Sequence, residues 1–295
     1  GSGCHPGHPR PFAKRTFMIA LFSHTLLVRL GLTVLHALWE LAVLGFLVAL
    51  GLALLRNRGP RAAYVWACLG LAAMVAAPMA TFLALGAPPA SAPESPVAMV
   101  LVEGAVTEAT WNRLVPWAPL AALAWLAGVA LMLARLGAGL WWLERAYLGR
   151  SEPAPEAWQA RLDALAVRLG LRRAVGLRVS RSVATPLLIG WIRPVVLVPT
   201  AAFLNLSPTA LEAVLAHELA HVRRGDYLAN LLQTLAEAFL FFHSCAWWLS
   251  RRIRELREHC CDDAAAALCG DPLILAEGLT ALERLRRNFS PIPEP

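Results

Sequence analysis

The chain has 295 residues, of which 58% are hydrophobic and only 16% are charged, and its formal net charge at pH 7 is +7. An ordinary soluble domain is about half apolar and about a quarter charged, so the composition argues against one and indicates that lipid is part of the solvent. Many arginines flank apolar stretches, as in Arg56–Arg58 and Arg251–Arg254. We interpret the basic charge as anchoring at a membrane surface rather than nucleic-acid binding, because no pattern of aromatic and basic stacking residues accompanies it.

Before the first apolar run, residues 1–29 are interpreted as a partly disordered leader, because Gly1–Arg15 is rich in Gly, Pro, His and basic side chains. Met18 is a candidate for the natural start. These residues are left out of the fold argument.

Three long apolar runs follow, and they are Leu32–Leu55, Ala62–Leu85 and Leu114–Leu143. Each exceeds the roughly 20 residues that an α-helix needs to cross a bilayer. The sequence therefore predicts a transmembrane region over residues 30–143 that consists of three helices.

The loops between these runs predict the orientation. The short link Arg56–Arg61 is strongly basic and is expected to be cytoplasmic. The segment 86–113 is rich in Pro, Ala and Ser and is expected to be an external loop. The third helix would then return the chain to the cytoplasm, where residues 144–290 are predicted to form a separate domain. The basic leader would lie outside, which argues against this orientation.

The predicted cytoplasmic domain mixes helices with a few strands. Helical periodicity covers Glu156–Leu169, and strand patterns bounded by prolines predict a small sheet with at least one free edge: Val175–Val183, Leu187–Ile192 and Val195–Val198. Ser207 and Pro208 are typical of a helix start, which predicts a helix to about Arg224. A further helix is expected from Ala264, with a break at Gly270–Pro272 and an end near Arg287.

The chemistry is indicated by His217-Glu218-Leu219-Ala220-His221, which matches H-E-x-x-H. Residues i and i+4 lie on one face of a helix, so His217 and His221 can bind one ion together. Glu218 can then act as the general base for a water on that ion. The flanking residues are apolar, which predicts that the motif is embedded in a core.

A catalytic zinc ion usually has three protein ligands and one open position. The best candidate for the third ligand is Glu258, and Asp262, four residues later, could orient a neighbouring histidine. The weaker rivals are Glu255, His259 and Asp263. The alternative is that this stretch is a solvated helix face with charges paired along it.

The apolar stretch Leu228–Leu249 is long enough to cross a bilayer, but it lies between His221 and Glu258. If it crossed, the proposed ligands would lie on opposite sides of the membrane. We therefore expect one helix that packs against the motif helix and lies partly in the cytoplasmic leaflet. His243 within it is interpreted as a core or interface residue rather than a ligand.

The sequence contains six cysteines: Cys4, Cys68, Cys245, Cys260, Cys261 and Cys269. None of them has the C-x-x-C spacing of a structural zinc site. Free thiols in a reducing compartment are expected.

Taken together, these residues resemble the BlaR/MecR family of integral-membrane zinc metallopeptidases over about residues 30–285. The likeness covers the three apolar runs, Ala216–Tyr227, Asn230, Phe241–His243, Trp247–Trp248, Arg257–Glu258 and Asp262. The E-x-x-x-D element also resembles the related HtpX and CAAX-protease type.

The resemblance implies a mainly α-helical protein with a gluzincin-like α+β protease domain in the cytoplasm. It implies one zinc ion on His217, His221 and Glu258, with Glu218 activating water, in a multi-pass protein of a bacterial-type inner membrane. In such antibiotic-response sensors the domain cleaves itself and a transcriptional repressor after an external β-lactam-binding domain is acylated. The sequence after Arg287 contains no fourth apolar helix and no S-x-x-K-bearing domain, so either the chain is truncated or it belongs to members without a sensor.

The expected function is therefore cleavage of a cytoplasmic or membrane-proximal protein, with a transcriptional repressor as a candidate substrate. The expected partners are this substrate and the bilayer, without direct nucleic-acid binding, and homo-oligomerisation is left open. The alternatives are a non-catalytic signalling or scaffold protein with a structural zinc site and an HtpX-like quality-control protease. A pore or transporter is disfavoured because few charged residues interrupt the apolar runs.

Overall fold

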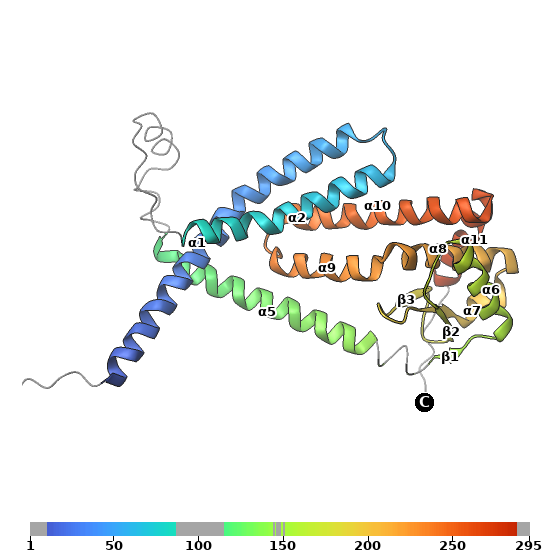
Figure 1. Ribbon diagram of the computed structural model, residues 1–295, viewed down its shortest axis with the longest axis horizontal. Helices are drawn as coiled ribbons and strands as arrows, with labels where there is room; N and C mark the ends of the chain where they lie inside the picture. The colour runs from blue at the N-terminus through green and yellow to red at the C-terminus, as the bar shows by residue number, and fades with distance from the viewer. Residues whose placement is uncertain (1–10, 87–114, 144, 146–148, 150, 288–295) are drawn as a thin grey trace, which may run out of the picture.

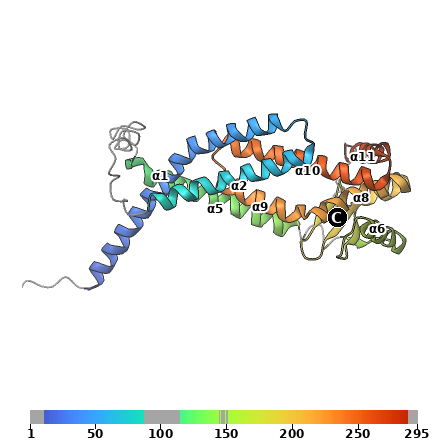
Figure 2. The same cartoon turned by 45° about the horizontal axis from the view of Figure 1, so that its top comes forward.

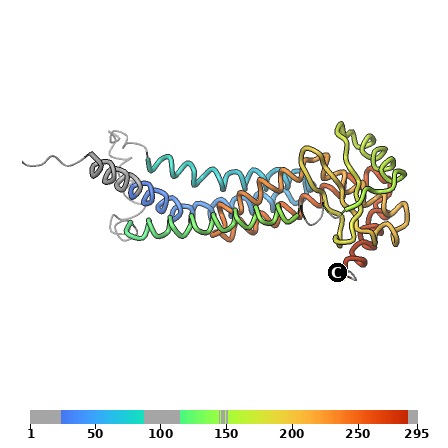
Figure 3. The backbone as a smooth tube through the Cα atoms, turned by 90° about the horizontal axis from the view of Figure 1, so that it is seen from below, coloured from blue at the N-terminus to red at the C-terminus, as the bar shows by residue number. Residues whose placement is uncertain are grey.

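The computed structural model of the chain describes residues 11–86, 115–143, 145, 149 and 151–287. Long helices lie side by side at one end, and a smaller globular part lies at the other end (Figures 1 and 3). The predicted external loop at 86–113 lies, apart from Gly86, outside the described residues.

The three predicted apolar helices are present as α1 (Pro11–Leu54), α2 (Pro60–Ala84) and α5 (Ala118–Leu143), the last preceded by the short 3-10 helix η1 (Val115–Trp117). Within these elements three segments are long and apolar enough to cross a membrane: His24–Leu54, Pro60–Ala84 and Val115–Leu143. Many of their large side chains, such as Phe46 and Leu131, are exposed, as expected for surfaces that face lipid. Helix α1 begins at Pro11, so residues 11–29, interpreted as a partly disordered leader, have helical backbone.

The prediction of one helix over Leu228–Leu249 is wrong. The chain forms a helical hairpin, with α9 (Asp226–Phe239) leading away from the motif helix and α10 (Ser244–Cys269) returning. The turn is stabilised by His243, whose Nδ1 accepts a hydrogen bond from the Cys245 backbone N–H at 3.2 Å and so caps the start of α10. Helix α10 lies alongside α2, and α9 lies beside α5 (Figures 1 and 2).

The tip of this hairpin contacts the middle of the membrane-spanning segments. The His243 Nε2 atom lies 3.0 Å from the Leu38 carbonyl oxygen of α1, and the Trp125 indole of α5 donates to the Phe239 carbonyl oxygen at 2.9 Å. His243 is buried there, in agreement with its interpretation as a core residue. The hairpin thus enters among the three helices and returns to the side from which it came.

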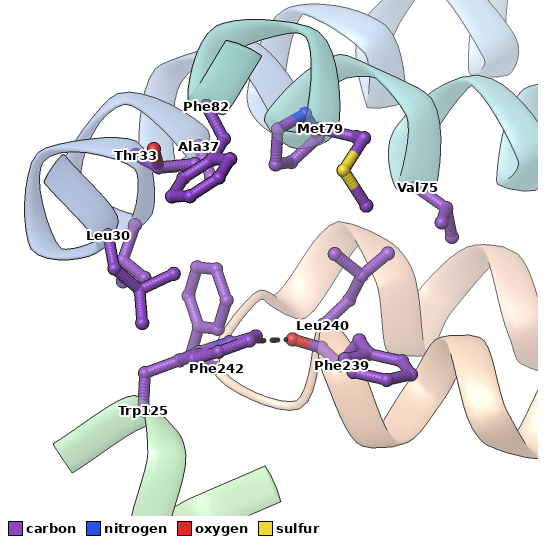
Figure 4. A pocket seen from close by; sticks show the side chains of 12 residues that line it. Leu30, Thr33, Ala37, Val75, Met79, Phe82, Trp125, Phe239, Leu240 and Phe242 are labelled. Atoms are coloured by element: carbon purple, nitrogen blue, oxygen red, sulfur yellow. Dashed lines mark hydrogen bonds between the residues drawn. The ribbon is translucent and has the colours of Figure 1, made fainter. Parts of the chain in front are cut away.

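An apolar cavity of about 320 Å³ lies beside the tip (Figure 4). Its walls come from α1, α2, α5 and the hairpin, and include Leu30, Met79, Phe82, Trp125 and Leu240. No charged side chain is among its lining residues, and the surface of the cavity is almost entirely apolar.

The globular part contains the predicted small sheet. Its strands are β1 (Glu152–Pro153), β2 (Gly176–Ser180), β3 (Leu187–Ile189) and β4 (Val195–Pro199), in the order β1-β2-β4-β3. β2 and β4 are parallel, and the two outer strands pair antiparallel to them. The predicted strands were each found, with the first two shorter than expected, and β3 supplies the expected free edge.

The motif helix is α8 (Pro208–Arg224), with the predicted bounds. The Ser207 hydroxyl accepts the Ala210 N–H at 3.2 Å, and Gly225 ends the helix in the left-handed conformation with φ 71°, which glycine adopts without a steric penalty. Buried leucines of α8, including Leu211 and Leu215, pack against β4 in the main core of the domain. This packing fixes the motif helix on the sheet.

The remaining helices are α6 (Glu156–Arg168), α7 (Thr200–Asn205) and α11 (Pro272–Arg287). The helix expected from Ala264 is the end of the longer α10, because α10 begins at Ser244. The predicted break is observed, with Gly270 at φ 79° and Pro272 opening α11.

Candidate metal centre

Helices α8 and α10 bring the predicted ligands together. His217 and His221 lie one turn apart on α8, and Glu258 comes from α10. His217 and Glu258 are 9% and 54% exposed in their side chains, so the histidine belongs to the core while the carboxylate borders solvent. The three residues could together bind a metal ion.

The three donor atoms form a nearly equilateral triangle. The Nε2 atoms of His217 and His221 are 3.2 Å apart, and the Glu258 Oε2 atom lies 3.5 Å and 3.6 Å from them. Nitrogen and oxygen ligands at about 2.0–2.1 Å from a tetrahedral zinc ion are roughly 3.3–3.4 Å apart. The side chains therefore fit such an ion with little rearrangement.

A second layer of acidic groups lies behind the histidines. The Asp226 Oδ2 atom is 2.8 Å from the His221 Nδ1 atom, and the Asp262 Oδ1 atom is 3.0 Å from the His217 Nδ1 atom. Carboxylates in this position orient imidazole ligands and increase their basicity. The Asp226 pair is a well-formed hydrogen bond. The Asp262 pair is close but not aligned as one, since the His217 Nδ1 has no hydrogen-bond partner among the described residues.

The electrostatic field of the site favours a cation. Burial lowers the pKa of His221, but the stronger combined effect of hydrogen bonds with Asp226, Cys261 and Glu258 raises it to about 12. Hydrogen bonds from His217 and His221 hold the pKa of Glu258 well below its usual range. An excess of negative groups around two imidazoles is the environment expected where a metal cation binds.

Glu218 lies between the two histidines on α8. Burial raises the pKa of its carboxyl group, and the neighbouring imidazoles of His221 and His217 act in the opposite direction. A carboxylate with a raised pKa is better suited to accept and release a proton near neutral pH than an ordinary surface glutamate.

Two members of the site were not predicted. Asp226 follows the helix-ending Gly225, where the chain reverses and brings the carboxylate back to His221. The Cys261 Sγ atom lies 3.3 Å from both the His221 Nδ1 and the Asp226 Oδ2. An aspartate directly after a helix-ending glycine was a usable signal for the first, whereas Cys261 is placed only by how α10 packs on α8.

The rival ligands lie elsewhere. His259 and Asp263 are exposed, and Glu255 pairs with Arg252 at 2.8 Å on the outer face of α10. The predicted alternative of charges paired along the helix thus applies to Glu255. The described cysteines are free, in agreement with the expectation of unpaired thiols.

A buried polar network joins α9 to α10 directly beside Glu258. Arg257 donates to Gln233 and Asn230, and Gln233 in turn donates to Ser250. The Glu237 carboxylate accepts from Ser250 and Arg254. Such a network fixes the two helices relative to each other when its members are satisfied, and thereby fixes where Glu258 is presented.

The candidate metal centre lies on the same side of the bundle as the basic link between α1 and α2. The Arg224 guanidinium at the end of α8 lies 4.7 Å from the ring centroid of Tyr64, near the start of α2. This contact connects the globular part to the end of the bundle that carries Arg56–Arg61.

Comparisons with known proteins agree with this arrangement. The chain is 31% identical over 101 residues to the regulatory protein BlaR1 of Bacillus licheniformis, which covers 34% of the chain and 17% of that protein. It is 39% identical over 66 residues to a protease HtpX homolog of Bacillus licheniformis, covering 21% of the chain and 22% of the relative. A protease HtpX homolog of Persephonella marina is 27% identical over 127 residues, covering 32% of the chain and 44% of the relative.

The matched part therefore spans less than half the length of each of these curated relatives. The sequence profile of a membrane-protease family matches far more of the chain, from residue 32 to residue 270. This range includes α1 from residue 32 onward, the other two apolar helices, the hairpin and every residue of the candidate metal centre. The chain belongs to the BlaR1 peptidase M56 family.

Proposed function

We propose that the chain is a zinc-dependent endopeptidase that hydrolyses peptide bonds of a cytoplasmic or membrane-proximal protein. The observation that carries this proposal is the triangle of donor atoms from His217, His221 and Glu258, with separations of 3.2–3.6 Å. Its dimensions suit one tetrahedral zinc ion with a fourth position open. Membership of a peptidase family supports the same reaction class.

The proposed mechanism assigns one task to each side chain. A zinc ion bound there would supply Lewis-acid polarisation of the scissile carbonyl and of the attacking water. Glu218 accepts the proton that the water loses and passes it to the nitrogen of the departing amine. Asp226 holds the His221 ring in place through Nδ1, and Asp262 lies in the corresponding position behind His217.

The sheet offers a place for an extended substrate. β3 is an edge strand and packs beside α8. A substrate segment that adds to this edge would gain backbone hydrogen bonds without a strict sequence requirement. It would also run close to the helix that carries Glu218.

The depth of the hairpin supports a substrate bond near the membrane surface. Helix α9 has 14 residues and is therefore about 21 Å long, and it connects Asp226 at the metal centre with a tip at mid-span. Half of a typical hydrocarbon core is about 15 Å thick. The centre would thus lie only several ångströms outside the hydrocarbon layer. The basic Arg56–Arg61 link on the same side supports a cytoplasmic orientation.

The biological role is proposed to be regulatory, with a transcriptional repressor as the candidate substrate, and the similarity to the regulatory protein BlaR1 supports it. The similarity to two protease HtpX homologs supports a quality-control protease as the second candidate. A single co-expressed repressor cleaved at one bond would favour the first role, and degradation of many misfolded membrane proteins would favour the second.

The decisive experiment replaces Glu218 by Gln in the full chain. We expect the variant to retain one zinc ion per chain by elemental analysis and to lose cleavage of a co-expressed protein substrate, because the amide cannot accept the proton. Glu212→Gln is the matched control, since Glu212 lies on the same helix but pairs with Arg161 at 2.7 Å outside the site. Undiminished cleavage by the Glu218 variant would overturn the proposal. Wild-type chain that binds zinc but cleaves nothing would favour the non-catalytic alternative.

A further inference from the structure

A groove of about 500 Å³ runs between the last turns of α5 and the α9–α10 hairpin. Arg135 and Gly139 of α5, Glu237 of α9 and Trp247 of α10 are among its lining residues. It extends from Ala238 and Trp247, near the hairpin tip, toward the end of the bundle that carries the candidate metal centre. We propose that this groove binds an anionic phospholipid, with the lipid phosphate paired to Arg135 and an acyl chain in the groove.

The first argument is the position of Arg135. It lies within the membrane-spanning segment Val115–Leu143, eight residues or about 12 Å before the end of the helix. Its side chain is exposed, and within the described part of the chain no carboxylate or carbonyl group binds it. A guanidinium at this depth costs free energy unless it finds an anion or reaches the interface. The headgroup phosphate of a lipid is the anion that the bilayer itself supplies.

The second argument concerns Glu237, the acidic group in the same groove. Its carboxylate already accepts hydrogen bonds from Ser250 and Arg254, so its charge is compensated from α10. Arg254 is not among the lining residues but compensates Glu237, so Arg135 remains as one positive charge at the groove. An anionic headgroup therefore meets attraction from Arg135 without uncompensated repulsion from Glu237.

The third argument is the shape and chemistry of the walls. A Cβ atom added to Gly139 would have no heavy atom within 4 Å, so the groove is open at this residue. Leu136 and Leu140 provide apolar lining, and Trp142 lies near the end of its membrane-spanning helix, where indoles prefer the headgroup level. Apolar walls around one cation suit a phospholipid better than free phosphate, because only the lipid has acyl chains that can cover the apolar surface.

The test measures which lipid the purified full chain retains. The chain is incubated with equal amounts of phosphatidylglycerol and phosphatidylcholine that carry the same acyl chains, and bound lipid is measured by native mass spectrometry. We expect preferential retention of phosphatidylglycerol. Arg135→Gln should reduce this preference about tenfold or more, as is typical for loss of a charge-assisted hydrogen-bonding partner. The matched control Arg172→Gln removes an exposed arginine of the globular part, outside the groove, and should leave the preference unchanged.

Gly139→Leu provides an independent variant, because its side chain would occupy the groove while Arg135 stays in place. It should reduce retention of both lipids, and it decides the question if Arg135→Gln does not fold. Excess inorganic phosphate should not displace the lipid. The proposal is overturned if the variants retain phosphatidylglycerol as the unaltered chain does, or if inorganic phosphate competes, which would indicate an anion site that does not recognise lipid.

Discussion

At the scale of single residues, the geometry of the candidate metal centre depends on the orientation of the His221 ring. Its Nε2 atom belongs to the donor triangle, and its Nδ1 atom lies within hydrogen-bonding distance of Asp226 and Cys261. Because both ring nitrogens are engaged on opposite sides, the ring has one productive orientation. Burial raises the pKa of the Cys261 thiol, so the thiol remains protonated at neutral pH and can donate to Asp226 rather than compete for the metal.

Replacement of Asp226 by Asn tests this arrangement. The amide keeps the shape but removes the charge that orients His221, so we expect zinc affinity to fall about 10–100-fold. Competition with a chromophoric chelator measures the affinity. Asp263→Asn is the control, because Asp263 is exposed on α10 and should have no effect. Equal zinc affinity of the Asp226 variant and the unaltered chain would mean that Asp226 has only a structural role.

At the scale of elements, α10 is the helix that connects the candidate membrane-spanning segments to the candidate metal centre. It runs without interruption over Ser244–Cys269, from the hairpin tip to Glu258 and beyond. The tip packs closely against Gly128 of α5. A Cβ atom added to Gly128 would lie 2.1 Å from the Phe241 ring. This close approach allows the hairpin to pack among the three apolar helices.

Gly128→Leu should therefore displace Phe241 and destabilise the bundle by about 1–3 kcal/mol, as overpacking does in other cores. A lower thermal unfolding temperature in detergent would be the measured result. Gly137→Leu is the matched control on the same helix, because a Cβ there meets nothing within 4 Å. Similar unfolding temperatures for the two variants would contradict the close packing of Phe241 against Gly128.

The buried network between α9 and α10 permits a second prediction at this scale. Arg257→Ala leaves the buried side-chain oxygen of Gln233 without its Arg257 donor, which costs about 1–3 kcal/mol. We expect lower thermal stability and reduced cleavage, since Glu258 is the next residue. Arg251→Ala, at an exposed position of the same helix, should change neither quantity. If cleavage remains at the level of the unaltered chain despite lower stability, the network does not position Glu258.

At the scale of the whole molecule, the contact between Arg224 and Tyr64 places the α1–α2 link and the globular part at one end. Cysteines introduced as Asn57→Cys and Leu204→Cys should therefore react with a membrane-impermeant maleimide from the same side of the membrane. If the proposed orientation is right, both are labelled in inside-out vesicles only. The unaltered chain supplies the background from its own cysteines. Labelling of the two positions from opposite sides would refute the arrangement.

Much of this could be predicted from local sequence. The apolar runs identify the membrane helices because only helices of sufficient length satisfy their backbone in lipid, and Ser207, Pro208 and Gly225 determine where α8 begins and ends. The spacing of His217 and His221 places both on one helical face. Glu258 was predicted as a partner from the chemistry of zinc ligands, given the motif upstream. The requirement that all ligands share one side of the membrane then excluded a membrane crossing by Leu228–Leu249.

The tertiary structure decided what depends on distant packing. Composition alone could not separate one interfacial helix from a hairpin over Leu228–Leu249, because both bury the same apolar residues. The turn between α9 and α10 lies against α1, where the His243 Nε2 atom is 3.0 Å from the Leu38 carbonyl oxygen. Asp226 and Cys261 become neighbours of His221 through a chain reversal and through the register of α10 on α8. Local periodicity specifies which face of a helix is buried, but the residue that it meets is set by the fold.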